Sequence, residues 1–173
     1  MAVLEILRYP DARLKREAVA VEHFDSALQA FIADLEETMR AGPGGIGIAA
    51  PQVDCLQRIV LIDLRGLRKP VPNHGRVVLI NPEITTWEGM AVGREGCMSV
   101  PDYTGNVIRA ERITLTACDA EGVTQQYDFS GYEARAVQHE LDHLDGLLFL
   151  DRLVSRHRDL FRRKVYQEPP PAK

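Results

Sequence analysis

Residues 132–144 read Tyr-Glu-Ala-Arg-Ala-Val-Gln-His-Glu-Leu-Asp-His-Leu, and this stretch predicts a helix that Gly146 closes near its C-terminal end. On a helix with 100° per residue, His139 and His143 lie about 40° apart and one turn displaced. Both imidazoles can therefore converge on one metal ion. Glu140 lies about 60° from His143, beside that ion, where a carboxylate can take a proton from metal-bound water.

A third metal ligand has to come from elsewhere in the chain. Cys97, in Glu95-Gly96-Cys97-Met98-Ser99, is the candidate, because a thiolate with two imidazoles and an open fourth position is a known catalytic set for zinc or another divalent metal. On spacing alone, a buried cysteine that acts as a small hydrophobe remains the alternative. The longer metzincin motif is excluded, because Phe149 stands where its third histidine would be.

The helix over 132–144 is one part of a wider pattern. Residues 24–41 carry apolar side chains at helical spacing, and a third helix is expected over residues 151–166. Residues 57–129 form short β-branched runs separated by turn residues, which is typical of strands. This order predicts the α+β class, with antiparallel or mixed sheets around the central helix that carries His-Glu-x-x-His, an N-terminal helix and a C-terminal helix. The expected strands are 58–63, 76–80, 84–87, 113–119 and 123–129.

Length and charge set further limits. The chain has 173 residues, and we expect one catalytic domain over 1–167 followed by a disordered, Pro-rich tail over 168–173. A formal net charge of −4 argues against a general binder of DNA or of anionic membranes. No apolar stretch is long enough to span a bilayer, and Glu5 and Arg8 interrupt any signal-peptide core, so we expect a cytoplasmic protein.

Three motifs occur in order along the chain: Gly45-Ile46-Gly47-Ile48-Ala49-Ala50-Pro51-Gln52, Glu95-Gly96-Cys97-Met98-Ser99 and Gln138-His139-Glu140-Leu141-Asp142-His143. Together they closely resemble the signature of peptide deformylase. The likeness extends over nearly the whole chain and includes residues 9–14 and 80–82. The resemblance implies a metallohydrolase that removes the formyl group from the N-terminal formyl-methionine of nascent polypeptides.

The same resemblance assigns roles to single residues. It implies that Glu140 is the general base and acid, and that the Gln52 amide and the Met98 backbone N–H stabilise the oxyanion of the formyl group. Members of this family typically carry Fe(II) and also accept nickel, cobalt or, with less activity, zinc, so Fe(II) is the expected metal. The implied ligands of this single divalent ion are Cys97, His139 and His143.

Substrate contacts also follow from the resemblance. The glycines of the 45–52 motif let a peptide backbone approach closely, so an extended substrate can pair with this edge as an added strand. An ordinary Gly-rich loop is the alternative interpretation. Met98 replaces the leucine that more usually follows the cysteine, and Asp102 stands where the family commonly has glycine, which alters the methionine pocket and the adjoining turn. The implied substrate-binding residues are Gly45, Ile46, Gly47, Gly96 and Met98.

Two groups of charged residues give further predictions. Glu95 and Arg109 are expected to pair and to fix the loop that carries Cys97, whereas the alternative is two exposed charges of little energetic value. The helix expected over 151–166 has a basic face, which is usually solvated but can also dock on the phosphates of ribosomal RNA, where nascent peptides emerge. Its basic residues are Arg156, Arg158, Arg162, Arg163 and Lys164.

Two other function classes compete with deformylation. A zinc peptidase or aminopeptidase with His-Glu-x-x-His requires a downstream carboxylate ligand, and Glu168 in the Pro-rich tail fits that role poorly. A non-enzymatic metal-binding or peptide-binding relative predicts the loss of a catalytic group, yet Gln52 and Glu140 are both present. A deformylase is therefore the function that the sequence favours.

Overall fold

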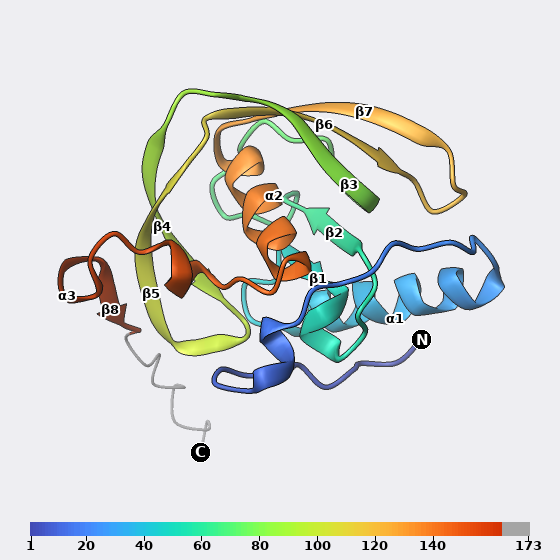
Figure 1. Cartoon of the computed structure of the whole chain (residues 1–173), viewed down its shortest axis with the longest axis horizontal. Coiled ribbons are helices and arrows are strands. Elements are labelled where there is room, and N and C mark those ends of the chain that lie inside the picture. The colour runs from blue at the N-terminus through green and yellow to red at the C-terminus, as the bar shows by residue number, and fades with distance from the viewer. Residues whose placement is uncertain (164–173) are drawn as a thin grey trace, which may run out of the picture.

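The computed structural model describes residues 1–163, in which two antiparallel sheets flank a buried helix (Figure 1). The tail expected over 168–173 and the boundary expected at 167 lie outside these residues. The expected α+β class is confirmed. The helices are α1 (Ser26–Ala41), α2 (Gly131–Leu144) and α3 (Arg156–Asp159), with short 3₁₀ turns η1 (Ala12–Lys15), η2 (Ala50–Val53) and η3 (Phe149–Arg152). The strands are β1 (Gly47–Ala49), β2 (Ile59–Asp63), β3 (Arg76–Glu88), β4 (Ala91–Cys97), β5 (Val100–Arg109), β6 (Arg112–Cys118), β7 (Thr124–Ser130) and β8 (Leu160–Arg162).

The larger sheet has the strand order β1-β2-β3-β6-β7 and separates two apolar clusters. Alternate residues of β2 point to opposite faces, as the two-residue period of a strand requires. Val60 and Ile62 pack with Val137 of α2, whereas Ile59 and Leu61 join the cluster that contains the buried face of α1. The four β2 side chains are fully buried, so α1 and α2 cover opposite faces of this sheet.

The smaller sheet, β4-β5-β8, lies beside α2, and Figure 1 shows α3 and β8 beyond it at the edge of the molecule. Strand β4 ends at Cys97, where the pairing with β5 changes register. Buried Cys97 belongs to a third apolar cluster with Val107 of β5 and Phe149 of η3. This packing brings the end of β4 against the middle of α2.

The end of α2 has the backbone geometry of a Schellman motif. Gly146 adopts a φ of 73°, its N–H donates to the carbonyl of His143, and the N–H of Leu147 donates to the carbonyl of Asp142. Close packing adds a second requirement for glycine, because a Cβ at position 146 would lie 2.5 Å from the carbonyl oxygen of Lys15. The sequence-based prediction that Gly146 closes this helix is confirmed.

The prediction of a C-terminal helix over 151–166 is wrong. In the described residues, α3 covers only four positions, and the next three form β8, which pairs with β5. The open edge of β5 supplies hydrogen-bond partners for β8, while Leu153 and Leu160 pack against the cluster around Phe149. These long-range contacts outweigh the helical spacing of the apolar residues.

Two further differences concern the strands. Strands β4 and β5 were not among the expected strands, because glycines at positions 93, 96 and 105 weaken the strand pattern. The separate strands expected over 76–80 and 84–87 are instead one strand, β3, whose register with β6 shifts near Asn81. Asn81 has a φ of 52° and bridges both backbone groups of Val21 through its side chain, which explains the irregularity.

Among residues 1–163, none of the helices combines the length and the apolar character that a membrane crossing needs.

Candidate metal centre and active site

Three buried side chains from two distant segments bring their ligand atoms together. Cys97 comes from the end of β4, and His139 and His143 come from successive turns of α2. One ligand atom from each of these residues lies within 4.8 Å of the other two. The Cys97 Sγ and the His143 Nε2 are 3.4 Å apart. Sequence spacing left the cysteine open between a ligand and a core residue, and the structure places it beside both histidines.

The orientation of His139 is fixed by Glu95. The Nδ1 of His139 lies 2.8 Å from the Oε1 of Glu95, so a neutral imidazole that donates this hydrogen bond to the carboxylate would leave the lone pair of its Nε2 for a metal. Burial lowers the pKa of His143 well below its usual value, which favours the neutral imidazole that ligates metals.

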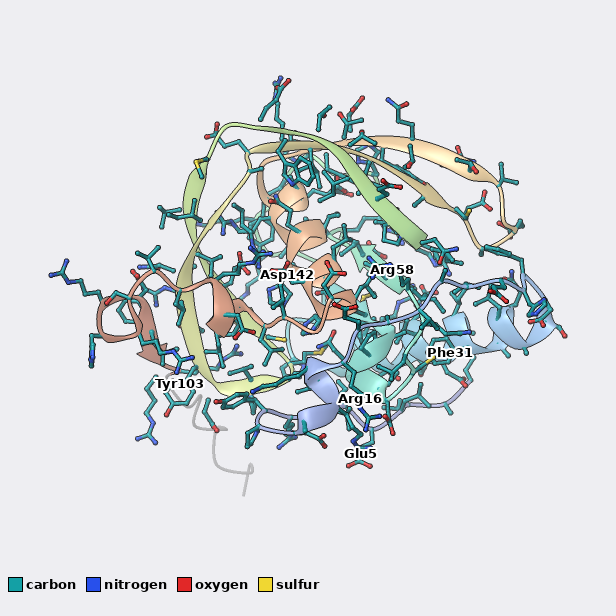
Figure 2. All side chains as sticks on the ribbon, in the orientation of Figure 1. Glu5, Arg16, Phe31, Arg58, Tyr103 and Asp142 are labelled. Carbon is teal, nitrogen blue, oxygen red and sulfur yellow. The ribbon has the colours of Figure 1, made fainter. Side chains whose placement is uncertain are left out.

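Glu95 is the centre of a buried ion-pair network. Both of its oxygens accept hydrogen bonds from Arg109, at 2.9 and 3.0 Å, and Arg135 of α2 donates a further bond at 2.8 Å. Arg109 also donates to Asp142 at 2.6 Å, and Figure 2 shows Asp142 on α2 near the centre of the molecule. The pairing that the sequence analysis expected between Glu95 and Arg109 is thus present, buried rather than exposed.

The charge state of Glu95 follows from these contacts. Burial alone would raise its pKa, but the hydrogen bonds with His139 and Arg109 outweigh burial and hold the pKa of this carboxyl well below its usual range. The carboxylate therefore stays ionised and keeps its four donor contacts with His139, Arg109 and Arg135.

Glu140 follows His139 on α2 and is buried, yet its Oε2 has no hydrogen-bond partner among the described residues. Burial raises the pKa of Glu140 to about 7. The carboxylate lies against β1, where a Cβ at Gly47 would sit 2.7 Å from the Glu140 Oε1. Glycine at position 47 therefore makes room for this carboxylate.

Gln52 in η2 also reaches this centre. Its Oε1 accepts a hydrogen bond from the backbone N–H of Ala49 at 3.0 Å, which leaves the amide nitrogen facing the site. This nitrogen donates to the Ser99 hydroxyl at 3.1 Å and lies 3.6 Å from the Cys97 Sγ. Two contacts thus determine which end of the Gln52 amide points toward the cysteine.

A cavity of about 350 Å³ opens at the centre. Gly45 lies against the carbonyl of Met39, so close packing already requires glycine there. Met98, in the turn after β4, also packs against the apolar cluster around α1. The cavity lining includes all the residues that the sequence analysis assigned to catalysis or substrate, together with two of the ligands: Gly45, Ile46, Gly47, Gln52, Gly96, Cys97, Met98, His139 and Glu140.

Sequence reasoning missed three residues of the network. Arg135 lies one helical turn before His139, and Asp142 lies three residues after it, so their buried positions beside the motif could have been inferred from helical spacing. Ser99, which holds Gln52, gave no signal beyond its place in the cysteine motif.

The donor set fits a divalent transition metal. One thiolate and two imidazoles are the borderline-soft ligands that zinc and iron(II) accept, and three protein ligands leave one coordination position open. The buried Glu140 Oε2, which has no partner within residues 1–163, belongs to a residue of the same cavity lining and adds a group that can hold water there. Three converging candidate ligands and a buried carboxylate beside them are the arrangement found in hydrolytic metal sites.

Comparisons with known proteins agree with this class. The family model for polypeptide deformylase matches residues 3–159. The chain is 42% identical to a peptide deformylase of Thermodesulfovibrio yellowstonii, over 95% of this chain and 97% of the relative. It is 46% identical to one of Alkalilimnicola ehrlichii, over 95% of this chain and 90% of the relative.

Solved structures show the same similarity. A peptide deformylase from Legionella pneumophila has a TM-score of 0.81 at 39% identity and covers 91% of this chain and 89% of its own. A class I type b peptide deformylase from Acinetobacter baumannii, crystallised with Met-Ala-Ser bound, has a TM-score of 0.83 at 35% identity and covers 88% and 99%. The chain belongs to the polypeptide deformylase family, whose members are hydrolases that remove N-formyl groups from nascent peptides.

Replacing Arg109 with Met tests the buried network. This change leaves the Glu95 and Asp142 carboxylates without their shared cation, and we expect the free energy of unfolding to fall by about 3 to 5 kcal/mol. Arg65→Met is the matched control, because Arg65 forms an exposed ion pair with Asp63 that contributes about 0 to 1 kcal/mol. Urea titrations measure both values. Equal, small losses in the two variants would contradict a network that organises the site.

Proposed function

We propose that the chain removes the formyl group from formyl-methionine at the start of nascent peptides, at a divalent metal held by Cys97, His139 and His143. The observation that carries the proposal is the convergence of these three ligand atoms within 4.8 Å beside Glu140. When bound, such an ion acts as a Lewis acid and lowers the pKa of a coordinated water toward neutrality. Fe(II) is the proposed native metal, and zinc, nickel or cobalt fit the same donors.

Glu140 is the proposed general base and acid. Its Oε2 has no other partner in the described residues, so this oxygen is available to accept a proton from the attacking water. The leaving nitrogen cannot depart as an amide anion and needs that proton. A pKa raised to about 7 lets Glu140 both accept and return the proton near neutral pH.

Gln52 and Met98 are the proposed oxyanion donors. The Gln52 amide nitrogen faces the Cys97 side of the cavity because Ala49 occupies its oxygen, so the donor is oriented before substrate arrives. The backbone N–H of Met98 comes from the turn directly after the cysteine. Donors that are already aligned stabilise the developing charge without reorganisation.

Substrate binding is proposed along the cavity between β1 and β4. Gly45, Ile46, Gly47 and Gly96 all belong to its lining. The Acinetobacter baumannii relative was crystallised with Met-Ala-Ser, which supports a cavity for a methionine-led peptide in this chain. We also propose that residues 1–167 act as one catalytic unit and that the protein works in the cytoplasm, where nascent chains emerge.

Contact with the ribosome stays a prediction. The long basic helix on which this prediction was based does not form, because α3 has only four residues. Arg156, Arg158 and Arg162 are nevertheless exposed around α3 and β8, where they could contact phosphates. Lys164 lies outside the described residues. A contact of this kind would weaken with added salt.

Formate release tests the proposed function. Protein purified without oxygen should contain about one divalent metal per chain and release formate from formyl-Met-Ala-Ser, while acetyl-Met-Ala-Ser stays intact. The Glu140→Gln variant should keep the metal, but its kcat should fall by at least about 10²-fold, because the substitution removes only the group that transfers the proton. Metal analysis and a formate assay measure both.

Two outcomes would oppose this proposal. Release of methionine from an unblocked peptide, without formate, would favour an aminopeptidase. A Cys97→Ala variant that keeps full metal content would remove the proposed ligand set.

Gln52→Ala tests the oxyanion donor separately. We expect kcat to fall about 10²- to 10³-fold, as for the loss of one such donor, with metal content unchanged. Gln125→Ala, at an exposed position of β7, is the control and should keep the kcat of the unmodified chain. If Gln52→Ala loses metal or unfolds before it loses turnover, the residue is structural and the assignment is wrong.

A further inference from the structure

Arg163 directly follows β8 at the edge of the smaller sheet. β8 pairs with β5 through Tyr103 opposite Arg162 and Thr104 opposite Phe161, and Figure 2 labels Tyr103 at this end of β5. The backbone N–H of Arg163 then donates to the carbonyl of Asp102 at 2.7 Å. This pairing holds the end of the described chain beside the turn that carries the cysteine motif.

The Arg163 guanidinium lies in the active-site cavity. Its Nη2 sits so close to Gly96 that a Cβ at position 96 would overlap it. The residue lines the cavity together with His139 and Glu140. The sequence analysis counted Arg163 among the basic side chains of a C-terminal helix, and the structure places it instead against the strand that ends at the proposed ligand Cys97.

The charge of Arg163 is incompletely paired. Its Nε is buried and has no hydrogen-bond partner among residues 1–163. Two other arginines of the cavity lining are engaged: Arg94 donates to Asn106 at 2.9 Å and lies 3.7 Å over the Phe161 ring, and Arg135 donates to Glu95. A buried guanidinium donor without an acceptor is costly, so the position favours an anionic ligand.

Glu95 and Glu140 line the cavity, but within residues 1–163 neither forms an ion pair with Arg163, and the Glu140 Oε2 and the Arg163 Nε both lack a partner. Glu95 is already shared by His139, Arg109 and Arg135. Arg8 lines the same cavity, and the lining as a whole has four arginines against two carboxylates, so it carries excess positive charge. A peptide with a negative side chain would supply the missing acceptor.

We propose that Arg163 is a specificity-determining residue that binds an acidic side chain one or two positions after the formyl-methionine. The inference rests on the proposed deformylase function and adds a substrate preference to it. Arg163 acts on the bound peptide and has no part in the proton transfer or the metal.

The test compares matched formyl peptides with the metal-loaded, full-length chain. The pairs are formyl-Met-Asp-Ser-amide against formyl-Met-Asn-Ser-amide, and formyl-Met-Ala-Asp-amide against formyl-Met-Ala-Asn-amide. Amidated ends remove the terminal carboxylate as a competing anion. In at least one pair, kcat/KM for the acidic peptide should be about fivefold to tenfold higher, which is within the net contribution of one typical hydrogen bond, and the ratio should fall with added salt.

Three variants separate charge recognition from a structural role. Arg163→Gln should bring the acidic-to-neutral ratio to about 1, mainly through KM, while Arg163→Lys keeps the charge and should keep most of the ratio. Arg16→Gln is the matched control, because Arg16 is exposed and outside the cavity lining, and its ratio should equal that of the unmodified chain.

The outcomes distinguish this inference from the proposed function. A ratio near 1 in the unmodified chain, a ratio that survives Arg163→Gln, or an equal loss for all four peptides would overturn the role of Arg163. If formyl-Met-Ala-Ser-amide still releases formate in those cases, the proposed function stands. If no formyl peptide releases formate, both fall.

Discussion

The hydrogen bond between Glu95 and His139 is the interaction on which the rest of the site depends. It joins β4 to α2 and fixes which nitrogen of His139 faces the proposed metal. Glu95 is a buried carboxylate, and it stays ionised because Arg109 and Arg135 surround it. The same arginines bind it to β5 and α2, so one carboxylate sets the distance between the strand that carries Cys97 and the helix that carries both histidines.

Buried charge of this kind stabilises little by itself, because desolvation offsets much of the attraction. The role of this buried network is to position the side chains of the site. A thiolate at the end of a strand and two imidazoles on a helix must hold a common centre while leaving space for Glu140, and Gly47 provides that space. The apolar clusters on both faces of the larger sheet hold α2 in place, and the network then sets the side chains.

The local parts of the site could be predicted from the sequence, because they depend on helical periodicity. His139, Glu140 and His143 lie within one helix, and Gly146 ends it as expected. Cys97 was an open choice between ligand and core residue, since nothing in its neighbours reveals what packs against it. Only the fold brings it to 3.4 Å from His143.

The C-terminal segment shows why the rest could not be predicted. The apolar residues Leu153, Leu160, Phe161 and Val165 gave the helix expected over 151–166, but the free edge of β5 makes a strand more favourable over 160–162. The same long-range pairing moved Arg163 from an expected solvated face into the cavity. Local pattern describes what a segment can form, whereas partners distant in the sequence decide what it does form.

The most direct measurement of the central claim is X-ray absorption at the metal edge of the zinc-loaded protein. The account predicts one sulfur ligand at about 2.3 Å and two histidine nitrogens at about 2.0 to 2.1 Å, with the sulfur lost in Cys97→Ala. A first coordination shell of nitrogen and oxygen alone in the unmodified protein would contradict it.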